Sequence, residues 1–138
     1  MSIVQTQTTS FKKELYQAIH DLSTDTIKIA LYTGNANLNE DTTVYSTSNE
    51  VSGTGYTAGG EIMTGVAISS SGYVAYANWN NVSWTAALTA RCALIYNASK
   101  GNKSVAVLDF GSDKTSTTTF TITMPANTST TALIRSSN

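Results

Sequence analysis

The side chains that could act as nucleophiles or proton-transfer groups are few and scattered. The only histidine is His20, and the only cysteine is Cys92, which lies in a run of apolar residues. A Ser-His-Asp site would need a serine at a strained turn, and the chain contains no Gly-x-Ser-x-Gly sequence. A cysteine nucleophile would need a base beside it, and His20 is the only candidate. We therefore expect His20 to be a surface or packing residue and Cys92 to be a small core side chain.

Glycosidases use two carboxylates that lie close together in space. Two pairs of acidic residues in this chain are close in sequence and are candidates for such a site. Asp109 and Asp113 flank a predicted turn, and Glu40 and Asp41 lie in a predicted loop. These are ordinary positions for turn and loop acids. The triplet that begins at Asp109, Asp-Phe-Gly, also occurs in protein kinases, but no glycine-rich loop, strand lysine or catalytic loop accompanies it. We expect no enzyme activity and no cofactor.

Oxygen-bearing side chains at alternate positions form the pattern most similar to a metal site. Asn35, Asn37, Asn39 and Asp41 resemble the first ligands of a calcium loop. The glycine and the bidentate glutamate that complete such a loop do not occur at their positions. Ordinary turn formation by asparagine explains the pattern better, so we predict no metal site.

Aromatic side chains at predicted strand positions could stack on sugar rings. The candidates are Tyr73, Tyr76, Trp79 and Trp84. Aromatic residues on strands belong to the core more often than to a sugar site. A carbohydrate site is therefore the weaker interpretation of these residues.

The composition excludes several functional classes. Serine and threonine account for 40 of the 138 residues, whereas charged residues account for only 12%. The formal net charge of -1 leaves no electrostatic basis for binding nucleic acid or an anionic membrane. No apolar stretch has the length of a membrane span, and the N-terminus has no signal-peptide pattern. The single cysteine favours assembly in a reducing compartment.

Charge is unevenly distributed along the chain. No lysine or arginine occurs between Lys28 and Arg91, and that segment contains four acidic residues, whereas the part from Arg91 onward is net positive. An acidic middle and a basic end could pack copies of the chain head to tail, or they could pair within the fold. We favour pairing within the fold.

One helix is predicted near the N-terminus. Apolar residues recur with helical spacing from Phe11 to Leu22, and Ser10 is a suitable N-cap. The opposite face is polar, so this helix should pack on a larger body. Residues 1–9 are polar and have no apolar period, and they are predicted to form an N-terminal arm.

The rest of the chain has the pattern of short antiparallel strands. Apolar and polar residues alternate in Thr26–Thr33, which predicts a strand with one buried face. Both faces are apolar in Ala93–Ile95 and Val105–Leu108, which predicts central strands. Turn residues, including the run Gly111–Lys114, separate the strands. The other predicted strands are Thr57–Thr64, Gly65–Ile68, Tyr73–Trp79, Val82–Trp84, Leu88–Tyr96, Ser104–Phe110, Thr118–Met124 and Thr131–Arg135.

These elements predict a mainly β fold, an antiparallel β-sandwich that is jelly-roll-like and carries one short N-terminal amphipathic helix. A single domain spans residues 10–138 and contains a long loop at about 34–60. That loop holds five of the nine glycines, and long loops without regular structure are often functional. Tyr45, Val51 and Tyr56 are its apolar anchors and our candidate assembly contacts. We expect the loop to be ordered against this domain or a neighbour.

Several stretches resemble a family of small virion proteins of tailed bacteriophages. They are His20–Leu22 with Asp25–Thr33, Asn49–Gly60, and Ala93–Asn97 through Ala106–Lys114. The resemblance covers the chain from about Phe11 to Arg135. It implies a non-enzymatic structural protein, because such members of phage virions commonly serve as cement or decoration proteins that bridge capsid subunits. The family offers no catalytic residues to assign to this chain.

The functional expectation is a capsid cement protein on the virion exterior, assembled in the host cytoplasm. Its partners would be the major capsid protein and copies of itself, as a dimer or trimer, with residues 1–9 and the 34–60 loop touching neighbours. We expect neither nucleic acid nor a membrane as a partner. Neutral hydroxyl-rich strand faces suit this role, because they lose little on desolvation and still form hydrogen bonds. The alternative is a receptor- or carbohydrate-binding module of a tail fibre or tail knob.

Overall fold

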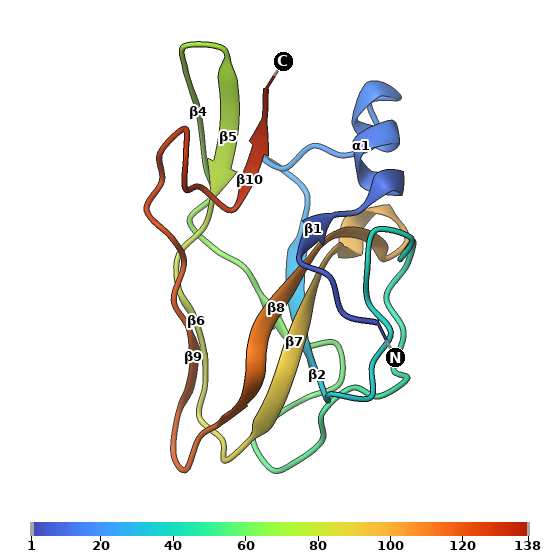
Figure 1. The fold of residues 1–138 in the computed structure, drawn as a ribbon, viewed down its shortest axis with the longest axis vertical. Helices are drawn as coiled ribbons and strands as arrows, with labels where there is room; N and C mark the ends of the chain where they lie inside the picture. Colours follow the sequence, from blue (N-terminus) through green and yellow to red (C-terminus); the bar gives the residue numbers. More distant parts are fainter. Residues whose placement is uncertain (1, 138) are drawn as a thin grey trace.

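Antiparallel pairing joins all the strands of this computed structural model, which describes residues 2–137 (Figure 1). The main sheet has the order β1-β8-β7-β2-β3, and two smaller sheets, β10-β5-β4 and β6-β9, form the opposite layer. The elements are β1 (Thr6–Gln7), α1 (Thr9–Tyr16), β2 (Ile27–Tyr32), β3 (Glu61–Ile62), β4 (Ala67–Ser71), β5 (Val74–Asn78), β6 (Val82–Trp84), β7 (Thr89–Asn97), the 3-10 helix η1 (Ala98–Lys100), β8 (Lys103–Thr115), β9 (Phe120–Ile122) and β10 (Ile134–Ser136).

The mainly antiparallel β fold with one short N-terminal helix is confirmed. Strands β2, β5, β6 and β9 lie within their predicted ranges, because each combines a clear period of two with flanking turn residues. Jelly-roll connectivity stays a prediction, because the strands form sheets of five, three and two.

The inner core lies between the two layers. Ile27, Ile29 and Leu31 of β2 point into it, as their alternate spacing predicts. The opposite layer contributes Trp84 and Phe120, whose rings meet edge to face with centroids 6.2 Å apart. Burying an apolar side chain of this size stabilises a fold by about 1.5 to 3 kcal/mol. This core therefore holds the two layers together.

A second core, the outer core, lies on the other face of the main sheet. Its members from the sheet are Ala30, Tyr32, Cys92, Leu94, Tyr96 and Val107, and the segment between β2 and β3 covers them with Ala36, Leu38 and Tyr45. The predicted central strands are confirmed, because both faces of β7 and β8 are buried there. The prediction of one buried face for Thr26–Thr33 is wrong, since the loop that follows this strand covers its second face.

Helix α1 begins and ends earlier than its apolar pattern predicts. Thr8 is the N-cap, since its side chain accepts a hydrogen bond from the backbone N–H of Phe11 at 3.3 Å. The predicted cap, Ser10, lies inside the helix. The helix stops at Tyr16, and Ala18 has a left-handed φ of 58°. Leu22 is still buried, but it reaches the inner core from the chain after the helix. No helix among residues 2–137 has the length and apolar character needed to cross a membrane.

The predicted N-terminal arm is part of the main sheet. Thr6 and Gln7 pair with Val107 and Ala106 of β8, and Ile3 forms a bridge with Leu38. Residues 2–9 therefore do not project as a free arm, because β8 and Leu38 pair with their backbone. Met1 lies outside the described residues.

A predicted turn, Gly111–Lys114, is a bulge inside β8. Ala90 pairs with Lys114, and two residues further along β7, Cys92 pairs with Asp109, so the extra residues bulge out of β8. Gly111 supplies the positive φ, 84°, that this detour requires. The turn-forming residues of this run thus bend a strand that continues beyond them.

The predicted strand Thr57–Thr64 is reduced to β3. Gly59 and Gly60 have positive φ values of 99° and 79°, so the chain turns until it reaches Glu61. A Cβ atom on Gly60 would lie 1.8 Å from the backbone oxygen of Ile29. Only glycine allows the chain to pass this close to β2.

Gly60→Ala should lower the free energy of unfolding by about 3 kcal/mol or more, because the new Cβ meets backbone that cannot move aside. Gly72→Ala is the matched control: its φ is also positive, at 58°, but no atom lies within 4 Å of the added Cβ. We expect the control to cost about 1 kcal/mol. Urea unfolding of both variants measures the difference, and equal losses would contradict the close-packing argument.

Candidate functional site

The only histidine lies in a buried polar network beyond the C-terminal end of α1. The Nε2 atom of His20 is 2.8 Å from Glu14 Oε1, and Nδ1 is 3.0 Å from Asn97 Nδ2. Asn97 Oδ1 accepts from the backbone N–H of Ser99, so its Nδ2 group is the donor to the histidine. The Nε2 atom faces the Glu14 carboxylate, and the imidazole packs on the ring of Phe11 with centroids 5.0 Å apart. The prediction of a packing histidine is confirmed.

Asp25 extends this network toward η1. Its carboxylate accepts from Asn97 Nδ2 at 2.7 Å and from Lys100 Nζ at 2.9 Å, and its side chain is 8% exposed. Burial raises the pKa of Asp25, but hydrogen bonds from Asn97, the backbone of Asp21 and Lys100 outweigh it and lower the pKa to about 2. No local sequence pattern could predict this contact, because Asp25 and Asn97 are 72 positions apart.

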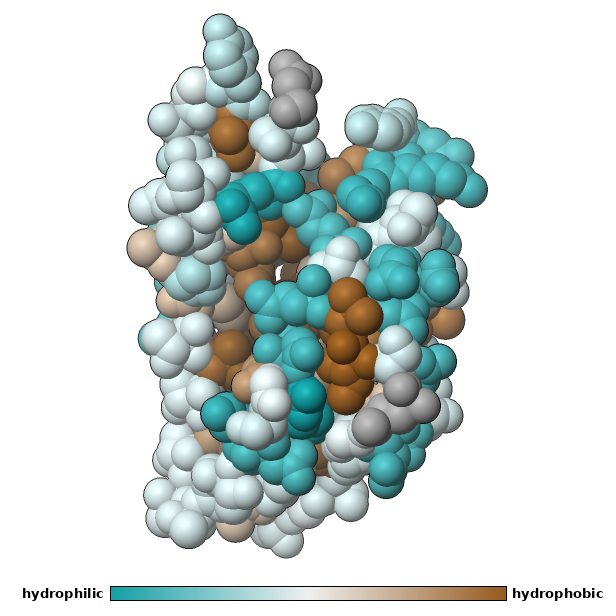
Figure 2. Space-filling model, viewed as in Figure 1, coloured by the Kyte–Doolittle hydropathy of each residue, from teal (hydrophilic) through white to brown (hydrophobic). Residues whose placement is uncertain are grey.

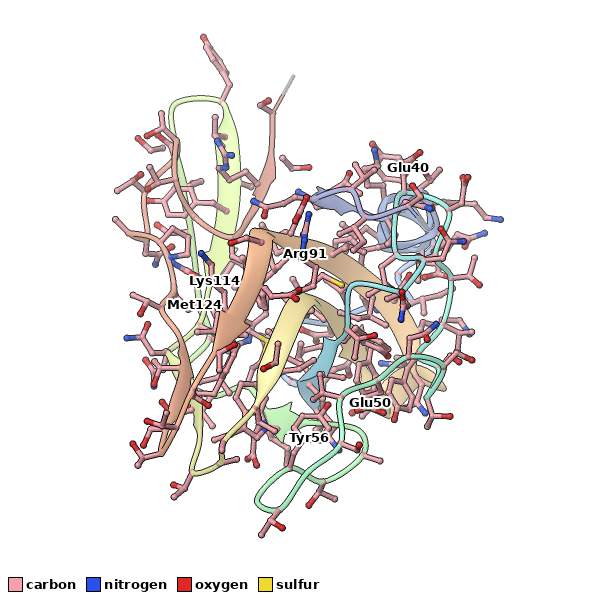
Figure 3. The ribbon with its side chains drawn as sticks, turned by 60° about the horizontal axis from the view of Figure 1, so that its bottom comes forward. Glu40, Glu50, Tyr56, Arg91, Lys114 and Met124 are labelled. Atoms are coloured by element: carbon pink, nitrogen blue, oxygen red, sulfur yellow. The ribbon has the colours of Figure 1, made fainter. Side chains whose placement is uncertain are left out.

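A second carboxylate, Glu50, organises the long loop (Figure 3). It accepts hydrogen bonds from the Tyr45 hydroxyl at 2.6 Å, from the Tyr56 hydroxyl, and from the backbone N–H of Gly59 at 2.9 Å. The Tyr96 hydroxyl donates to the carbonyl oxygen of Gly59 at 2.6 Å, and the rings of Tyr45 and Tyr96 stack with centroids 4.6 Å apart. This Glu50 cluster ties the loop to β7 of the main sheet.

The tyrosines of this region are poor acids. Burial, followed by hydrogen bonding to Glu50, raises the pKa values of Tyr45 and Tyr56. Burial and the charge of Glu50 raise the pKa of Tyr96 to about 12. These phenols therefore remain protonated donors near neutral pH.

The thiol of Cys92 is also unreactive. Burial raises its pKa to about 11, so almost no thiolate forms at neutral pH. Its side chain is fully buried in the outer core, which confirms the prediction of a small core residue.

The three candidate assembly residues of the loop face their own domain. Val51 is 6% exposed and Tyr56 is 9% exposed, and both belong to the inner core. The backbone N–H of Val51 donates to the carbonyl oxygen of Leu31 in β2, at 3.0 Å. The Tyr56 hydroxyl accepts from the backbone N–H of Leu31, also at 3.0 Å. Tyr45 is half-buried against the outer core. The loop is ordered against this domain, as expected, but Val51 and Tyr56 are not available to a neighbouring protein.

The acidic pairs considered for catalysis form no joint site. Asp109 pairs with Arg91 and accepts from the backbone N–H of Gly111. The Gly111 N–H, then the Arg91 guanidinium, holds the pKa of Asp109 below its usual range. Glu40 and Asp41 are exposed in the loop. This ion pair also shows that part of the basic end of the chain is neutralised within the fold.

The asparagine series makes turns. Asn39 Oδ1 accepts from the backbone N–H of Asp41 at 2.9 Å, and Asn39 Nδ2 donates to Asn37 Oδ1 at 3.3 Å. These contacts occupy the side-chain oxygens of Asn37 and Asn39. In residues 2–137, no three His, Cys, Asp or Glu side chains gather closely enough to hold a metal ion.

The aromatic candidates for sugar stacking divide into core and surface residues. Trp79 is 6% exposed and Trp84 is 2% exposed, so neither presents a ring to solvent. Tyr76 is half-buried. Tyr73, at the tip of the β4–β5 hairpin, is 88% exposed.

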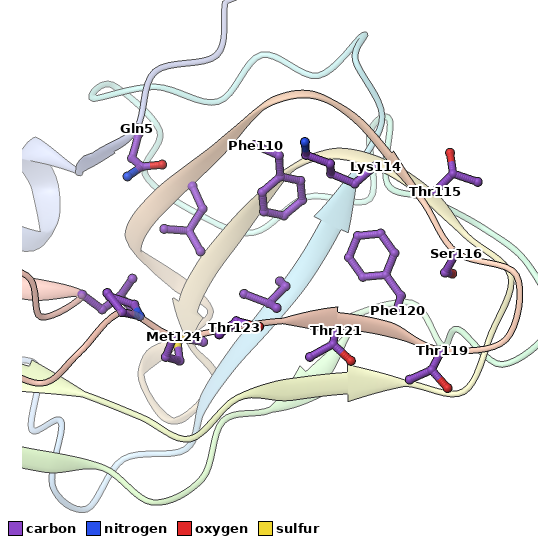
Figure 4. A pocket seen from close by; sticks show the side chains of 14 residues that line it. Gln5, Phe110, Lys114, Thr115, Ser116, Thr119, Phe120, Thr121, Thr123 and Met124 are labelled. Carbon is purple, nitrogen blue, oxygen red and sulfur yellow. The ribbon is translucent and has the colours of Figure 1, made fainter.

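Two surface features have no internal role that accounts for them. The β4–β5 hairpin projects from the body of the molecule (Figure 1), and all five residues of β4 are exposed. A groove with a volume of about 760 Å³ opens between β8 and β9 (Figure 4). Sequence patterns could not reveal this groove, because it forms where strands of different layers separate.

Comparison with known proteins adds no assignment. No protein-family model matches the chain, and neither a curated protein nor a solved structure is significantly similar to it. The resemblance to phage virion proteins therefore stays a prediction.

Glu50→Gln should reduce the free energy of unfolding by about 2 kcal/mol, because three donors lose a charged acceptor. Glu40→Gln is the control, since Glu40 is exposed and its change should cost less than about 0.5 kcal/mol. Chemical denaturation measures both effects. If the two variants lose the same stability, the Glu50 cluster does not organise the loop.

Asp25 should make stability depend on pH in the acid range. Because its folded pKa is lowered to about 2 from 3.8, its contribution is complete above about pH 4 and is lost as pH falls toward 2. Asp25→Asn should cost about 2 kcal/mol at pH 7 and flatten the stability profile between pH 4 and 2. Asp41→Asn, at an exposed position, should keep the wild-type slope. Urea unfolding across this range provides the comparison, and an unchanged slope in Asp25→Asn would refute the assignment.

Proposed function

We propose that this chain is a non-enzymatic structural protein of a phage virion, a capsid cement or decoration protein that stabilises contacts between major capsid protein subunits. The observation that carries the proposal is an uncharged layer around β4, β5 and β6. No charged residue occurs from Ile62 to Ala90. Figure 2 shows this layer as pale, whereas strongly hydrophilic residues gather over α1 and the main sheet. Another protein can cover such a surface without desolvating charges.

The edge of this layer supports a binding role. Strand β4 is the edge of the β10-β5-β4 sheet, and its pairing with β5 is regular. Natural edge strands are usually protected by lysine, proline or a bulge. The sequence of β4, Ala-Ile-Ser-Ser-Ser, has none of these devices. An unprotected edge suits a protein that is covered in its working state.

The use of the polar groups agrees with a role in assembly. The side chains of His20, Glu50 and Asp25 form hydrogen bonds inside the fold, and Cys92 is buried. The capsid is proposed as the binding partner because residues 11–135 resemble small phage virion proteins. The partners proposed are the major capsid protein and further copies of this chain.

The alternative, a receptor- or carbohydrate-binding module of a tail fibre or knob, has less support. Stacking on sugars needs exposed aromatic faces, and the rings of Trp79 and Trp84 are buried. Tyr73 is exposed, but a single ring on a hairpin does not make a sugar site.

Locating the chain on intact particles tests the proposal. A small tag at the C-terminus, visualised by gold labelling and electron microscopy, should mark the head of each particle. Labelling of the tail would favour the receptor-binding alternative. Absence of the chain from purified particles would refute a virion role altogether.

A charge placed on β4 tests the surface itself. Ser70→Lys should lower occupancy on the head by about tenfold, the effect of about 1.4 kcal/mol, because a buried contact must then desolvate an ammonium group. Ser70 is exposed, so the melting temperature should not change. Gln17→Lys, an exposed position at the end of α1, is the control and should bind normally. Full occupancy of Ser70→Lys would exclude β4 from the contact.

A further inference from the structure

The groove between β8 and β9 exposes part of the inner core. Its apolar lining consists of Leu108, Phe110, Phe120, Ile122, Met124 and Leu133. Lys114 is the only charged residue in the lining, and no ion pair is found for it among residues 2–137. Figure 4 shows the rings of Phe110 and Phe120 facing the groove from the two layers. A pocket of about 760 Å³ has room for several side chains.

The edge of β8 beside this groove is closed to another strand. Strand β1 covers β8 only at Ala106 and Val107. Beyond that point, the backbone N–H of Asp109 donates to Gln5 Oε1 at 3.0 Å, and the N–H of Gly111 donates to Asp109 Oδ1 at 2.8 Å. Because side chains already satisfy these donors, the groove is suited to receive side chains and not an added strand.

The β4–β5 hairpin carries the complementary feature. Tyr73 follows Gly72 at the turn and is 88% exposed, and Ile68 on β4 is 55% exposed. The pairing of β4 with β5 orders the hairpin backbone before it binds, so little backbone conformational entropy is lost on contact. Tyrosine is also enriched among residues that dominate interface energies. The hairpin therefore presents an anchor that its own fold does not use.

We infer that the β4–β5 hairpin of one copy inserts Tyr73 into the β8–β9 groove of a second copy. The hairpin has no charge, and the groove has one cation, Lys114, so no charged groups of like sign meet. The Lys114 ammonium can lie against the tyrosine ring as the phenol enters the apolar space. A tyrosine buries about 150 to 250 Å² in such a contact. This inference specifies the self-association that is part of the proposed function.

The contact is head to tail, because the hairpin and the groove are different surfaces of one chain. Such a contact either closes into a ring or continues as a filament. A closed ring, such as the proposed trimer, satisfies every hairpin and every groove at once. Pairing of two β4 edges is the competing dimer, but Ile68 is the one large apolar side chain of β4, so this pairing would bury little apolar surface.

Self-association of the isolated chain tests the inference independently of any capsid. Sedimentation equilibrium of the wild type should show reversible association. Tyr73→Ala should weaken association by at least about tenfold without changing the melting temperature. Tyr16→Ala is the matched control, because Tyr16 is 93% exposed on α1, and it should associate as the wild type does. A monomer at the highest soluble concentration, or equal effects of the two variants, would overturn the proposal.

Cross-linking identifies which surfaces meet. Ser71→Cys places a thiol on the hairpin and Thr115→Cys places one on the groove, whereas Cys92 is buried and serves as an internal control. A short bismaleimide should join the two variants only when they are mixed. Cross-links within the Ser71→Cys sample alone would instead indicate pairing of hairpins and refute the groove contact. If the chain associates as predicted but particles carry no label, the proposed function fails and this inference stands.

Discussion

The carboxylate of Glu50 is the constraint on which the covered face of the main sheet depends. Its three donors come from positions 45, 56 and 59, so one side chain gathers the second half of a loop that has little regular structure. The backbone of the same loop continues the edge of β2, where Val51 donates to Leu31. Without this closure, the apolar outer face of β2, β7 and β8 would be exposed to water.

Among the acidic residues in the middle of the chain, Glu50 is directed into the fold, whereas Glu40, Asp41 and Glu61 are exposed. Glu50 accepts a hydrogen bond from the backbone of its own loop. In the basic end of the chain, Arg91 forms an ion pair with Asp109, and Lys100 forms one with Asp25. Charges that pair within the fold cannot steer a partner over distance. Neither Asp109 nor Asp25 belongs to the acidic middle, so these ion pairs do not join the acidic middle to the basic end. In the opposite layer, β4, β5 and β6 carry no charge.

Local periodicity was enough to predict several of the strands, but it could not predict what closes the fold. Alternation located β2, and runs that are apolar on both faces predicted the two-sided burial of β7 and β8, because pleat geometry acts over neighbouring residues. The helix end at Tyr16, the bulge at Gly111 and the core positions of Val51 and Tyr56 depend on partners far away in sequence. Tyr56 shows the difference clearly: as an aromatic residue in a glycine-rich loop it suggested a contact, and only the fold shows that the contact is internal.

Two surface features, the β4–β5 hairpin and the β8–β9 groove, have no role in closing the fold. The β4–β5 hairpin carries no charge, so it offers little basis for nonspecific electrostatic binding. The groove remains open because the β8 edge is closed by side chains from Gln5 and Asp109 and not by a further strand. An added strand is therefore disfavoured at the β8 edge, beside the accessible apolar side chains of the groove. The outer edge of β4 is unpaired, and three of its five residues are serines. In the proposed assembly, the shape of the inserted Tyr73 side chain, and not the addition of a strand, selects the partner.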